Sequence, residues 1–394
     1  MAVYKNKKRV IVAIDTGFDG AKICVNGNLI NVPFMITDIT NDTENFGLRR
    51  IDDNFIRCIK DGRTYLLGDV AKSYLLDDSR RVARQADMES FYTLDRYKMP
   101  IFEVALNAFI AYALYQYQEI TKENDKLVPF RLDELSSWEI EVGVALPHEY
   151  IDTLMPIVEK YLRAPQCVEL LVGEMKTGEI KYNIKDTFYN SQIVCALINE
   201  AVDDEGKDYE GDSPYDHLPA LIIDAGYKTF ADMEFARDES ITNDLSNLDF
   251  AMNNINSRVA EYLTSVTGKH YTSYMVDKLA SSRDEVRYIN ENDVKSINVY
   301  DEQQKSIKEI SGPLISYLND KHGKLLDIKM ILVAGGTGEA YYPYIKDYCE
   351  KERPFLSDHT ILAGQHGFMG KECPPVFAIV CGLYKDILMQ LNEE

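Results

Sequence analysis

Two aspartates stand at the ends of apolar runs, and each is followed two positions later by a glycine. Asp15 follows residues 11–14 in "IVAIDTGFDGAK", and Asp224 follows residues 221–223 in "LIIDAGYKTF". An apolar run of this length predicts a buried strand, and a glycine just beyond it lets a ligand approach the backbone closely. Glycine-rich turns present backbone N–H groups to phosphate oxygens, and a carboxylate at a strand end can hold the water shell of Mg²⁺. The two segments therefore predict a polyphosphate and magnesium site.

Further residues of the two segments suit the same chemistry. Gly17 and Gly226 are the glycines of the two turns, Lys22 brings an ammonium group that can reach a phosphate, and Thr229 ends the second turn. Both segments have the order strand, Asp-x-Gly, aromatic residue, turn, strand, which indicates two related domains. The Asp-x-Gly at residues 204–206 lies in an acidic stretch with no strand before it, so the tripeptide alone carries little weight. The alternative explanation is a structural β-turn that occurs twice with solvated aspartates.

A third glycine-rich segment follows another apolar run. The sequence "KMILVAGGTGEAYYPYIKDY" (residues 329–348) predicts a buried strand, then a turn with Gly335, Gly336 and Thr337, then a helix. Paired glycines let the backbone pack against a purine or ribose, and the helix N-terminus favours phosphate. Such turns are common in α/β proteins, and this one gains significance from its position after the two Asp-x-Gly hairpins.

A glutamate follows a further predicted strand. "EIEVGVALPHEY" alternates as a strand that stops at Pro147, so that Glu149 lies on the turn before a helix over residues 151–163. A carboxylate there can orient or deprotonate the water that attacks the γ-phosphate. The alternative is a glutamate that stabilises the first turn of the helix through the helix dipole. His148 beside it is interpreted as a bystander.

The remaining periodicity predicts an α/β protein. The expected helices cover residues 103–118, 151–163, 191–202 and 374–391; the expected hairpins turn within residues 25–28, at Thr177-Gly178 and within the segment 221–235. Residues 200–216 hold many acidic residues and no apolar period, which predicts an exposed loop. The chain from residue 236 to about 328 is polar and is expected to be helical.

Composition limits the classes of function. The length of 394 residues favours two domains. The net charge of −21 disfavours direct binding of DNA by the body of the protein. The basic clusters at residues 4–9 and 79–84 are interpreted as solvated faces or subunit contacts. No apolar run is long enough to span a membrane, and the apolar segment near the N-terminus is too short for the core of a signal peptide. Seven cysteines without a CxxC pair predict free thiols, mostly buried, and a cytoplasmic location.

The order of these motifs resembles the actin, Hsp70 and sugar-kinase superfamily from about residue 9 to residue 390. Within it, "LPHEY" (residues 146–150) and "FAIVCGLYKDI" (residues 377–387) resemble segments of the ParM-like bacterial actins, the plasmid-segregation filament proteins. The resemblance implies an actin-like α/β fold of two related domains with a nucleotide cleft between them.

The expected domain I covers residues 1–155 and is closed by the C-terminal helix 374–394, and domain II covers residues 156–373. The resemblance also implies roles for individual residues. The implied phosphate and metal contacts are Asp15, Gly17 and Lys22 from domain I and Asp224, Gly226 and Thr229 from domain II, with Mg²⁺ at Asp15 and Asp224; Gly335, Gly336 and Thr337 line the nucleoside pocket, and Glu149 and Asp224 are catalytic. Tyr227-Lys228 departs from the small residues that are usual in the second turn, which puts its fit to the nucleotide in question, and the choice between ATP and GTP stays open.

The function that the resemblance implies is nucleoside triphosphate hydrolysis coupled to dynamic filaments that segregate plasmid DNA. The partners implied are other copies of the chain and, because the surface is acidic, a small DNA-binding adaptor. A sugar-type kinase on the same fold is the main alternative, although no substrate-binding insertion or catalytic aspartate of domain I stands out. An Hsp70-type ATPase would carry a peptide-binding domain after the closing helix, where this chain ends, and a silent scaffold would not need Asp15, Glu149 and Asp224.

Overall fold

The computed structural model describes residues 8–18, 20–41, 55–75, 93–124, 127–209, 213–236, 248–290 and 292–393. The chain forms two compact units. The first unit comprises Met1–Asp208, Phe368–Lys371 and Ile379–Glu394, and the second comprises Tyr209–Gly367 and Glu372–Ala378.

The boundary near residue 208 differs from the expected one at residue 155. The segment between these positions belongs to the first unit because its strands pair with strands of the N-terminal part: β8 (Gln166–Val172) with β5 (Ile56–Lys60), and β10 (Asp186–Ser191) with β7 (Glu139–Leu146). Backbone pairing across a sheet thus decides which unit this segment joins.

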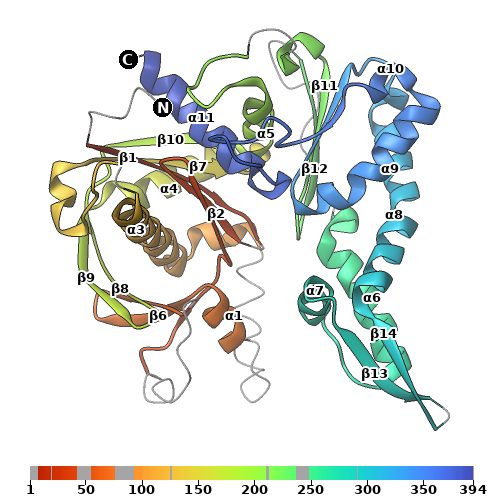
Figure 1. The fold of residues 1–394 in the computed structure, drawn as a ribbon, viewed down its shortest axis with the longest axis horizontal. Helices are drawn as coiled ribbons and strands as arrows, with labels where there is room; N and C mark the ends of the chain where they lie inside the picture. Colours follow the sequence, from red (N-terminus) through yellow and green to blue (C-terminus); the bar gives the residue numbers. More distant parts are fainter. Residues whose placement is uncertain are drawn as a thin grey trace. The chain divides into compact units, whose positions relative to one another are not determined.

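The first unit contains two five-stranded sheets (Figure 1). One sheet has the order β10-β7-β1-β2-β3 and the other has the order β4-β6-β5-β8-β9. The strands not yet located are β1 (Arg9–Thr16), β2 (Ala21–Val25), β3 (Asn28–Val32), β4 (Ile36–Asp38), β6 (Arg63–Leu67) and β9 (Met175–Tyr182). The expected hairpin at residues 25–28 is confirmed, with Asn26 and Gly27 at positive φ between β2 and β3.

Helix α3 (Pro100–Glu123) packs between the two sheets of the first unit, as Figure 1 shows. Its apolar side chains share one core with residues of both sheets, among them Val12 and Ile14 of β1 and Val168 of β8. The helix expected at residues 103–118 is therefore confirmed and extends at both ends. Among the described residues, the other helices of this unit are α1 (Asp69–Leu75), α4 (Ile151–Arg163), α5 (Gln192–Ala201) and α11 (Ala378–Glu393), together with the 3-10 helices η3 (Leu94–Lys98), η4 (Leu132–Ser137) and η5 (His148–Tyr150).

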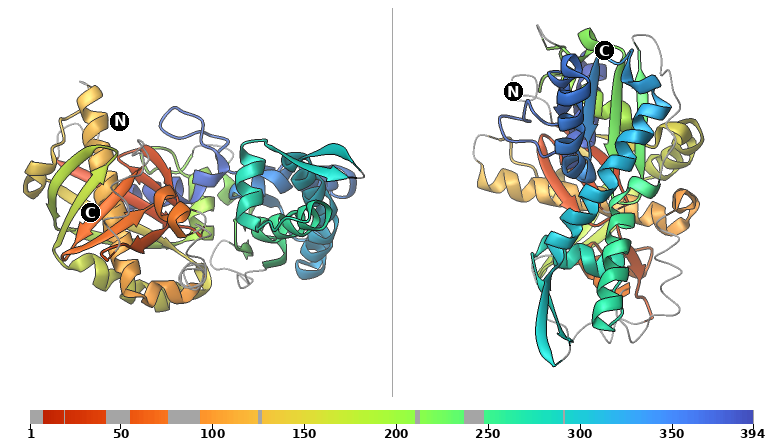
Figure 2. Two further views of the ribbon diagram at one scale, coloured as in Figure 1. Left: turned by 90° about the horizontal axis from the view of Figure 1, so that it is seen from below. Right: turned by 90° about the vertical axis from the view of Figure 1, so that its right-hand side faces the viewer.

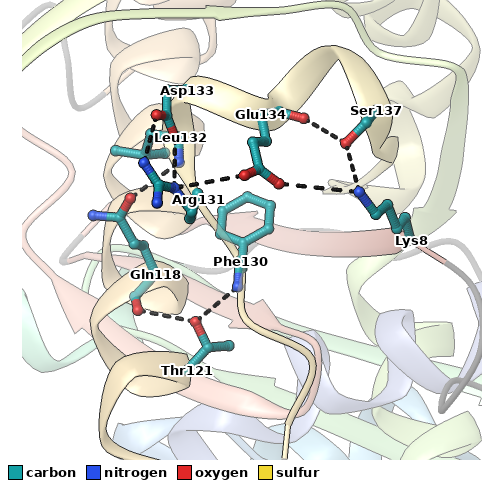
Figure 3. A network of polar contacts seen from close by, with 9 residues as sticks. All are labelled: Lys8, Gln118, Thr121, Phe130, Arg131, Leu132, Asp133, Glu134 and Ser137. Atoms are coloured by element: carbon teal, nitrogen blue, oxygen red, sulfur yellow. Dashed lines mark hydrogen bonds and ion pairs between the residues drawn. The ribbon is translucent and has the colours of Figure 1, made fainter.

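Polar contacts hold the segment between α3 and β7 (Figure 3). Arg131 forms two hydrogen bonds, of 3.0 and 2.7 Å, to the carboxylate of Asp133. Lys8, directly before β1, donates to the hydroxyl of Ser137 at 3.2 Å, and the N–H of Glu139 donates to the carbonyl of Lys8 at 2.8 Å. The exposed Arg131–Asp133 ion pair is local to this segment and contributes little to stability. The two hydrogen bonds of Lys8 place the start of β7 beside β1.

The second unit is built on one four-stranded sheet of order β12-β11-β15-β16. Its strands are β11 (Ala220–Ala225), β12 (Phe230–Phe235), β15 (Met330–Ala334) and β16 (Thr360–Leu362). Its helices are α6 (Met252–Thr267), α7 (Ser273–Ser281), α8 (Val299–Lys321), α9 (Gly336–Glu352) and α10 (Pro354–Ser357), with short turns η6 (Pro214–His217), η7 (Leu248–Phe250), η8 (Gly323–Leu325) and η9 (Pro375–Phe377). A hairpin of β13 (Glu285–Asn290) and β14 (Asp293–Asn298) extends beyond α6 and α8 (Figure 2).

Three local predictions from the sequence are wrong. The hairpin of β8 and β9 turns at Gly173-Glu174, and Thr177-Gly178 lie within β9 at an irregularity of the ladder, where the N–H of Leu170 donates to the hydroxyl of Thr177. The segment expected to be helical up to residue 328 contains the β13–β14 hairpin, in which Val286 and Ile297 are buried opposite each other while Ile289 and Val294 form an exposed pair. Residues 200–216 are not simply exposed: the Gly206 backbone packs against Leu388 of α11, and a carboxylate oxygen of Asp204 accepts the N–H of Met369 at 2.8 Å.

The structure also bears on the cysteines and on the basic clusters. Six of the seven free cysteines are buried, and Cys167 is exposed. The basic residues 79–84 and most of residues 4–9 lie outside the described residues. Within the described ranges, no helix combines the length and the apolar content that crossing a bilayer requires.

Candidate functional site

In the first unit, three parallel strands end at the same edge of one sheet. Asp15 of β1 pairs with Ala145 of β7, which pairs with Asn190 of β10. Ligands of open α/β sheets bind beyond the carboxyl ends of such strands. This edge therefore brings together Asp15, the turn that holds Glu149, and Gln192 at the start of α5.

Asp15 is buried and has polar neighbours on two elements. Lys22 lies directly opposite it on β2, and cross-strand partners share one face of a sheet. The amide of Gln192 donates a hydrogen bond of 2.7 Å to Asp15 Oδ1. Burial raises the pKa of Asp15, against the opposing effects of Lys22, the Gln192 bond and the charge of Arg96. Burial therefore disfavours the charged form of this carboxylate, and a bound cation would stabilise that form.

The glycine after this strand lies beside the lysine. A Cβ atom added at Gly17 would stand 3.0 Å from Lys22 Nζ and 3.7 Å from Asp15 Oδ2. The backbone of the turn, the ammonium group and the carboxylate thus lie within one small volume. The structure places Asp15, Gly17 and Lys22 together, as the sequence predicts.

Glu149 lies on η5, between the end of β7 and the start of α4, and is exposed. Its charge raises the pKa of the neighbouring Tyr150. The Nδ1 atom of His148 lies 3.1 Å from Ser191 Oγ, and burial lowers the pKa of His148. Glu149 therefore shares the sheet edge with Asp15, but the polar group bonded to Asp15 is the amide of Gln192.

In the second unit, the Asp-x-Gly hairpin closes tightly. Asp224 lies in β11, level with Ala334 of the parallel strand β15. The N–H of Gly226 donates to the carbonyl of Thr229 at 2.8 Å, and the hydroxyl of Thr337 donates to the carbonyl of Gly226 at 2.8 Å. The second hairpin and the glycine-rich turn after β15 are thus joined directly by a hydrogen bond.

Tyr227-Lys228, which depart from the small residues usual in the second turn, do not open it. The carbonyls of Gly226 and Tyr227 accept the N–H groups of Met252 and Asn253, at 3.3 and 2.7 Å, from the first turn of α6. These bonds fix two peptide groups of the hairpin.

The glycines of the second unit differ in what the fold demands of them. Gly335 has φ +83°, and a Cβ there would lie 2.3 Å from the carbonyl oxygen of Ala225 and 2.8 Å from Asp224 Oδ1. The nearest atom to an added Cβ is 3.4 Å away at Gly226 and 3.8 Å away at Gly336. Packing therefore requires glycine at position 335, whereas it leaves room for a side chain at positions 226 and 336, where a ligand can approach the backbone.

The architecture matches solved structures of bacterial actin-like proteins over nearly the whole chain. The actin-like protein Alp7A superposes with a TM-score of 0.67 at 14% identity, covering 98% of this chain and 99% of that one. A 15-stranded ParM filament from Clostridium botulinum gives 0.60 at 17%, and Bacillus thuringiensis ParM with ATP gives 0.60 at 15%, each covering 98% of this chain and 100% of the other. The chain has the actin-like fold of the ParM and Alp proteins. The fold expected from the sequence motifs is confirmed, although no protein-family model and no curated protein matches the chain.

Within this actin-like fold, two residues near Asp15 carry no motif in the sequence. Gln192 directly follows β10, and its position at the same sheet edge as Asp15 is the only sign that could have drawn attention to it. Arg96 lies in η3 and is buried, with its charge near Asp15. Both reach the site through tertiary structure.

The oxygen ligands suit a hydrated divalent cation. The described residues contain no group of three or more His, Cys, Asp and Glu side chains that could hold a metal by themselves. Each unit offers one carboxylate near a strand end, Asp15 in the first unit and Asp224 in the second. Mg²⁺ keeps several waters and takes one or two carboxylates plus substrate phosphates, so these residues fit it as ligands to its water shell.

Proposed function

We propose that this actin-like chain binds and hydrolyses ATP or GTP and assembles into dynamic filaments that segregate plasmid DNA. The observation that carries the proposal is the pair of Asp-x-Gly hairpins, one in each unit, at the carboxyl ends of central strands. The solved structures that share the fold include a ParM with ATP and a ParM filament.

In this proposal the two hairpins bind the phosphates of the nucleotide. Backbone N–H groups near Gly17 and Gly226 and the ammonium of Lys22 serve as donors. The N-terminus of α9, which begins at Gly336, adds a favourable dipole for phosphate, and Gly335 and Thr337 shape the nucleoside side. Asp15 and Asp224 hold the waters of Mg²⁺, which neutralises charge that develops on the phosphates.

Hydrolysis requires a group that orients the attacking water. Glu149 is the proposed group, since its carboxylate can also accept a proton. Gln192 is the second candidate, because it is already fixed by its bond to Asp15 and an amide can orient water without accepting a proton.

The proposed partners follow from assembly and charge. The chain binds further copies of itself in the filament and carries a net charge of −21, which disfavours contact with DNA phosphates. A small basic adaptor protein is therefore proposed to link the filament to plasmid DNA in the cytoplasm.

Sedimentation tests the proposed function directly. The full chain is centrifuged at high speed with Mg·ATP, with Mg·GTP, with non-hydrolysable analogues and without nucleotide, while phosphate release is followed in parallel. Polymer should pellet with at least one triphosphate, and it should persist longer with the analogue. Failure to pellet under every condition contradicts the filament and brings the kinase alternative forward.

The metal part of the proposal has its own test. The change Asp224→Ala should weaken binding of the Mg-nucleotide far more than binding of the metal-free nucleotide, as measured by calorimetry with and without Mg²⁺. Asp327→Ala, at an exposed position of the same unit, is the control. Equal losses with and without metal would assign Asp224 to the fold rather than to the ion.

A further inference from the structure

Thr16, between Asp15 and Gly17, is held at both its carbonyl and its hydroxyl by one short turn. The guanidinium of Arg96 donates to the Thr16 carbonyl oxygen, and the hydroxyls of Tyr97 and Thr16 lie 3.1 Å apart. Thr16, Arg96 and Tyr97 are all buried. We call Arg96 and Tyr97 the Thr16 clamp.

The clamp determines which way the next backbone donor points. The Thr16–Gly17 peptide is trans, so the carbonyl of Thr16 and the N–H of Gly17 point in opposite directions. Because Arg96 holds the carbonyl, the Gly17 N–H points away from η3. A carbonyl that is free to turn would let this peptide rotate and would remove the donor from its direction.

Arg96 is itself held in place. Its guanidinium carbon lies 4.3 Å from the centre of the Phe18 ring and 5.0 Å from that of Tyr97, and it donates to the Tyr97 hydroxyl at 3.3 Å. The hydroxyl of Tyr161 in α4 bonds to the Tyr97 carbonyl at 3.1 Å. A planar, stacked guanidinium gives a directed donor that a flexible ammonium cannot reproduce.

The position of the charge also matters. Arg96 is 2% exposed and lies close enough to act on the carboxylate of Asp15, as Lys22 does from the other strand. A buried cation acts on nearby groups more strongly than one in water. Two cations therefore accompany one carboxylate at the turn, which favours an anionic ligand there.

We propose that Arg96 is a positioning residue for nucleotide phosphates: through Thr16 it aims the Gly17 N–H at the phosphate and places a positive charge behind the turn. The proposal rests on the proposed nucleotide binding and adds a residue that does not itself touch the nucleotide. It predicts that loss of the clamp weakens binding of phosphates and not binding of the base and sugar.

The test measures affinities of the full chain for Mg·ATP, Mg·GTP, adenosine and guanosine. Arg96→Met should lower the triphosphate affinity by about 10-fold or more, the scale of a hydrogen bond to a charged group, and leave nucleoside affinity unchanged. Arg96→Lys should keep most of the loss, since it retains the charge without the planar donor. Arg9→Met is the matched control, because Arg9 pairs with Glu139 and Glu141 at the other end of β1.

A milder pair of variants covers the case in which Arg96→Met does not fold. Tyr97→Phe removes only the hydroxyl, which meets Thr16 and accepts from Arg96, and should lower triphosphate affinity about 3-fold. Tyr182→Phe is its control, since that buried hydroxyl donates to the carbonyl of Asn107 at 2.9 Å in the core.

The possible outcomes separate the inference from the proposed function. The positioning role would be overturned by wild-type triphosphate affinity in folded Arg96→Met, by full recovery of that affinity in Arg96→Lys, or by equal losses of triphosphate and nucleoside affinity. If Arg96→Met does not fold, an unchanged triphosphate affinity in Tyr97→Phe would overturn it. A wild-type chain that binds neither ATP nor GTP would overturn the proposed function instead, and the inference with it.

Discussion

At the scale of single residues, Glu149 and Gln192 each have only one of the two features expected of a group that orients the attacking water. Glu149 has the carboxylate but is exposed, whereas Gln192 lacks a base but is bonded to Asp15. We expect Glu149→Ala to retain nucleotide binding and to slow phosphate release by roughly 10²-fold or more, the scale of general-base loss. Its filaments should outlive those of the wild type. A wild-type rate in this variant, together with a loss of that size in Gln192→Ala, would transfer the role to Gln192.

Glu141 predicts a dependence of stability on pH. It is buried in β7 beside Arg9, and burial raises its pKa from an ordinary 4.5 to about 7. A raised pKa means that the folded state binds the proton more tightly, so stability falls as pH rises from about 4.5 to about 7 and is level above that. The side chain in Glu141→Gln cannot ionise. The free energy of unfolding of the variant minus that of the wild type should therefore be higher at pH 8 than at pH 5 by roughly 1–3 kcal/mol.

Urea denaturation at the two pH values measures this difference. Glu139→Gln is the control, because the pKa of Glu139 is lowered by Lys185 and Arg9 and its effect has the opposite sign. An identical pH profile for Glu141→Gln and the wild type would show that Glu141 does not titrate in this range.

At the scale of elements, the junction of β15 and α9 depends on one of its two glycines. Gly335→Ala would place a Cβ 2.3 Å from the Ala225 carbonyl oxygen at a φ of +83°, while Gly336→Ala meets nothing nearer than 3.8 Å. We expect Gly335→Ala to destabilise the chain by about 3 kcal/mol or more and Gly336→Ala by about 1 kcal/mol or less. Thermal unfolding without nucleotide compares the two. Similar melting temperatures for both variants would contradict the close approach of β11 and this turn.

The same pair of variants separates stability from binding. Gly336 has room for a side chain in the fold, so a loss of nucleotide affinity in Gly336→Ala without a loss of stability would support close approach of the ligand there.

At the scale of the whole molecule, the net charge of −21 opposes assembly because like-charged subunits repel. Polymerisation with bound triphosphate should therefore improve as salt or Mg²⁺ is raised from low to moderate concentration, since screening shortens the repulsion. Light scattering over a salt series measures this, with an analogue that is not hydrolysed to keep turnover constant. Assembly that is strongest at the lowest salt would contradict the argument.

The charge also predicts the behaviour of the chain towards DNA. A gel shift at physiological salt should show no binding by the chain alone and binding after a basic adaptor is added. Tight, sequence-specific binding by the chain alone would exclude the adaptor.

The sequence by itself determined the features that depend on neighbouring residues. The strands that carry Asp15 and Asp224 near their ends, the helix over residues 151–163 and the glycine turn after β15 all follow from local periodicity and glycine positions, and the resemblance of their order implied the actin-like fold. The sequence did not show the β13–β14 hairpin, whose short strands carry apolar residues on both faces and so lack an alternating pattern, and it misplaced the turn of β8 and β9. Tertiary structure alone brought Gln192 to Asp15 and Arg96 to Thr16. Gln192 reaches Asp15 because parallel pairing aligns the ends of β10, β7 and β1, and Arg96 reaches Thr16 from the buried turn η3. Gln192 and Arg96 act on the site only through the residues that they contact, and no spacing in the sequence predicts those contacts.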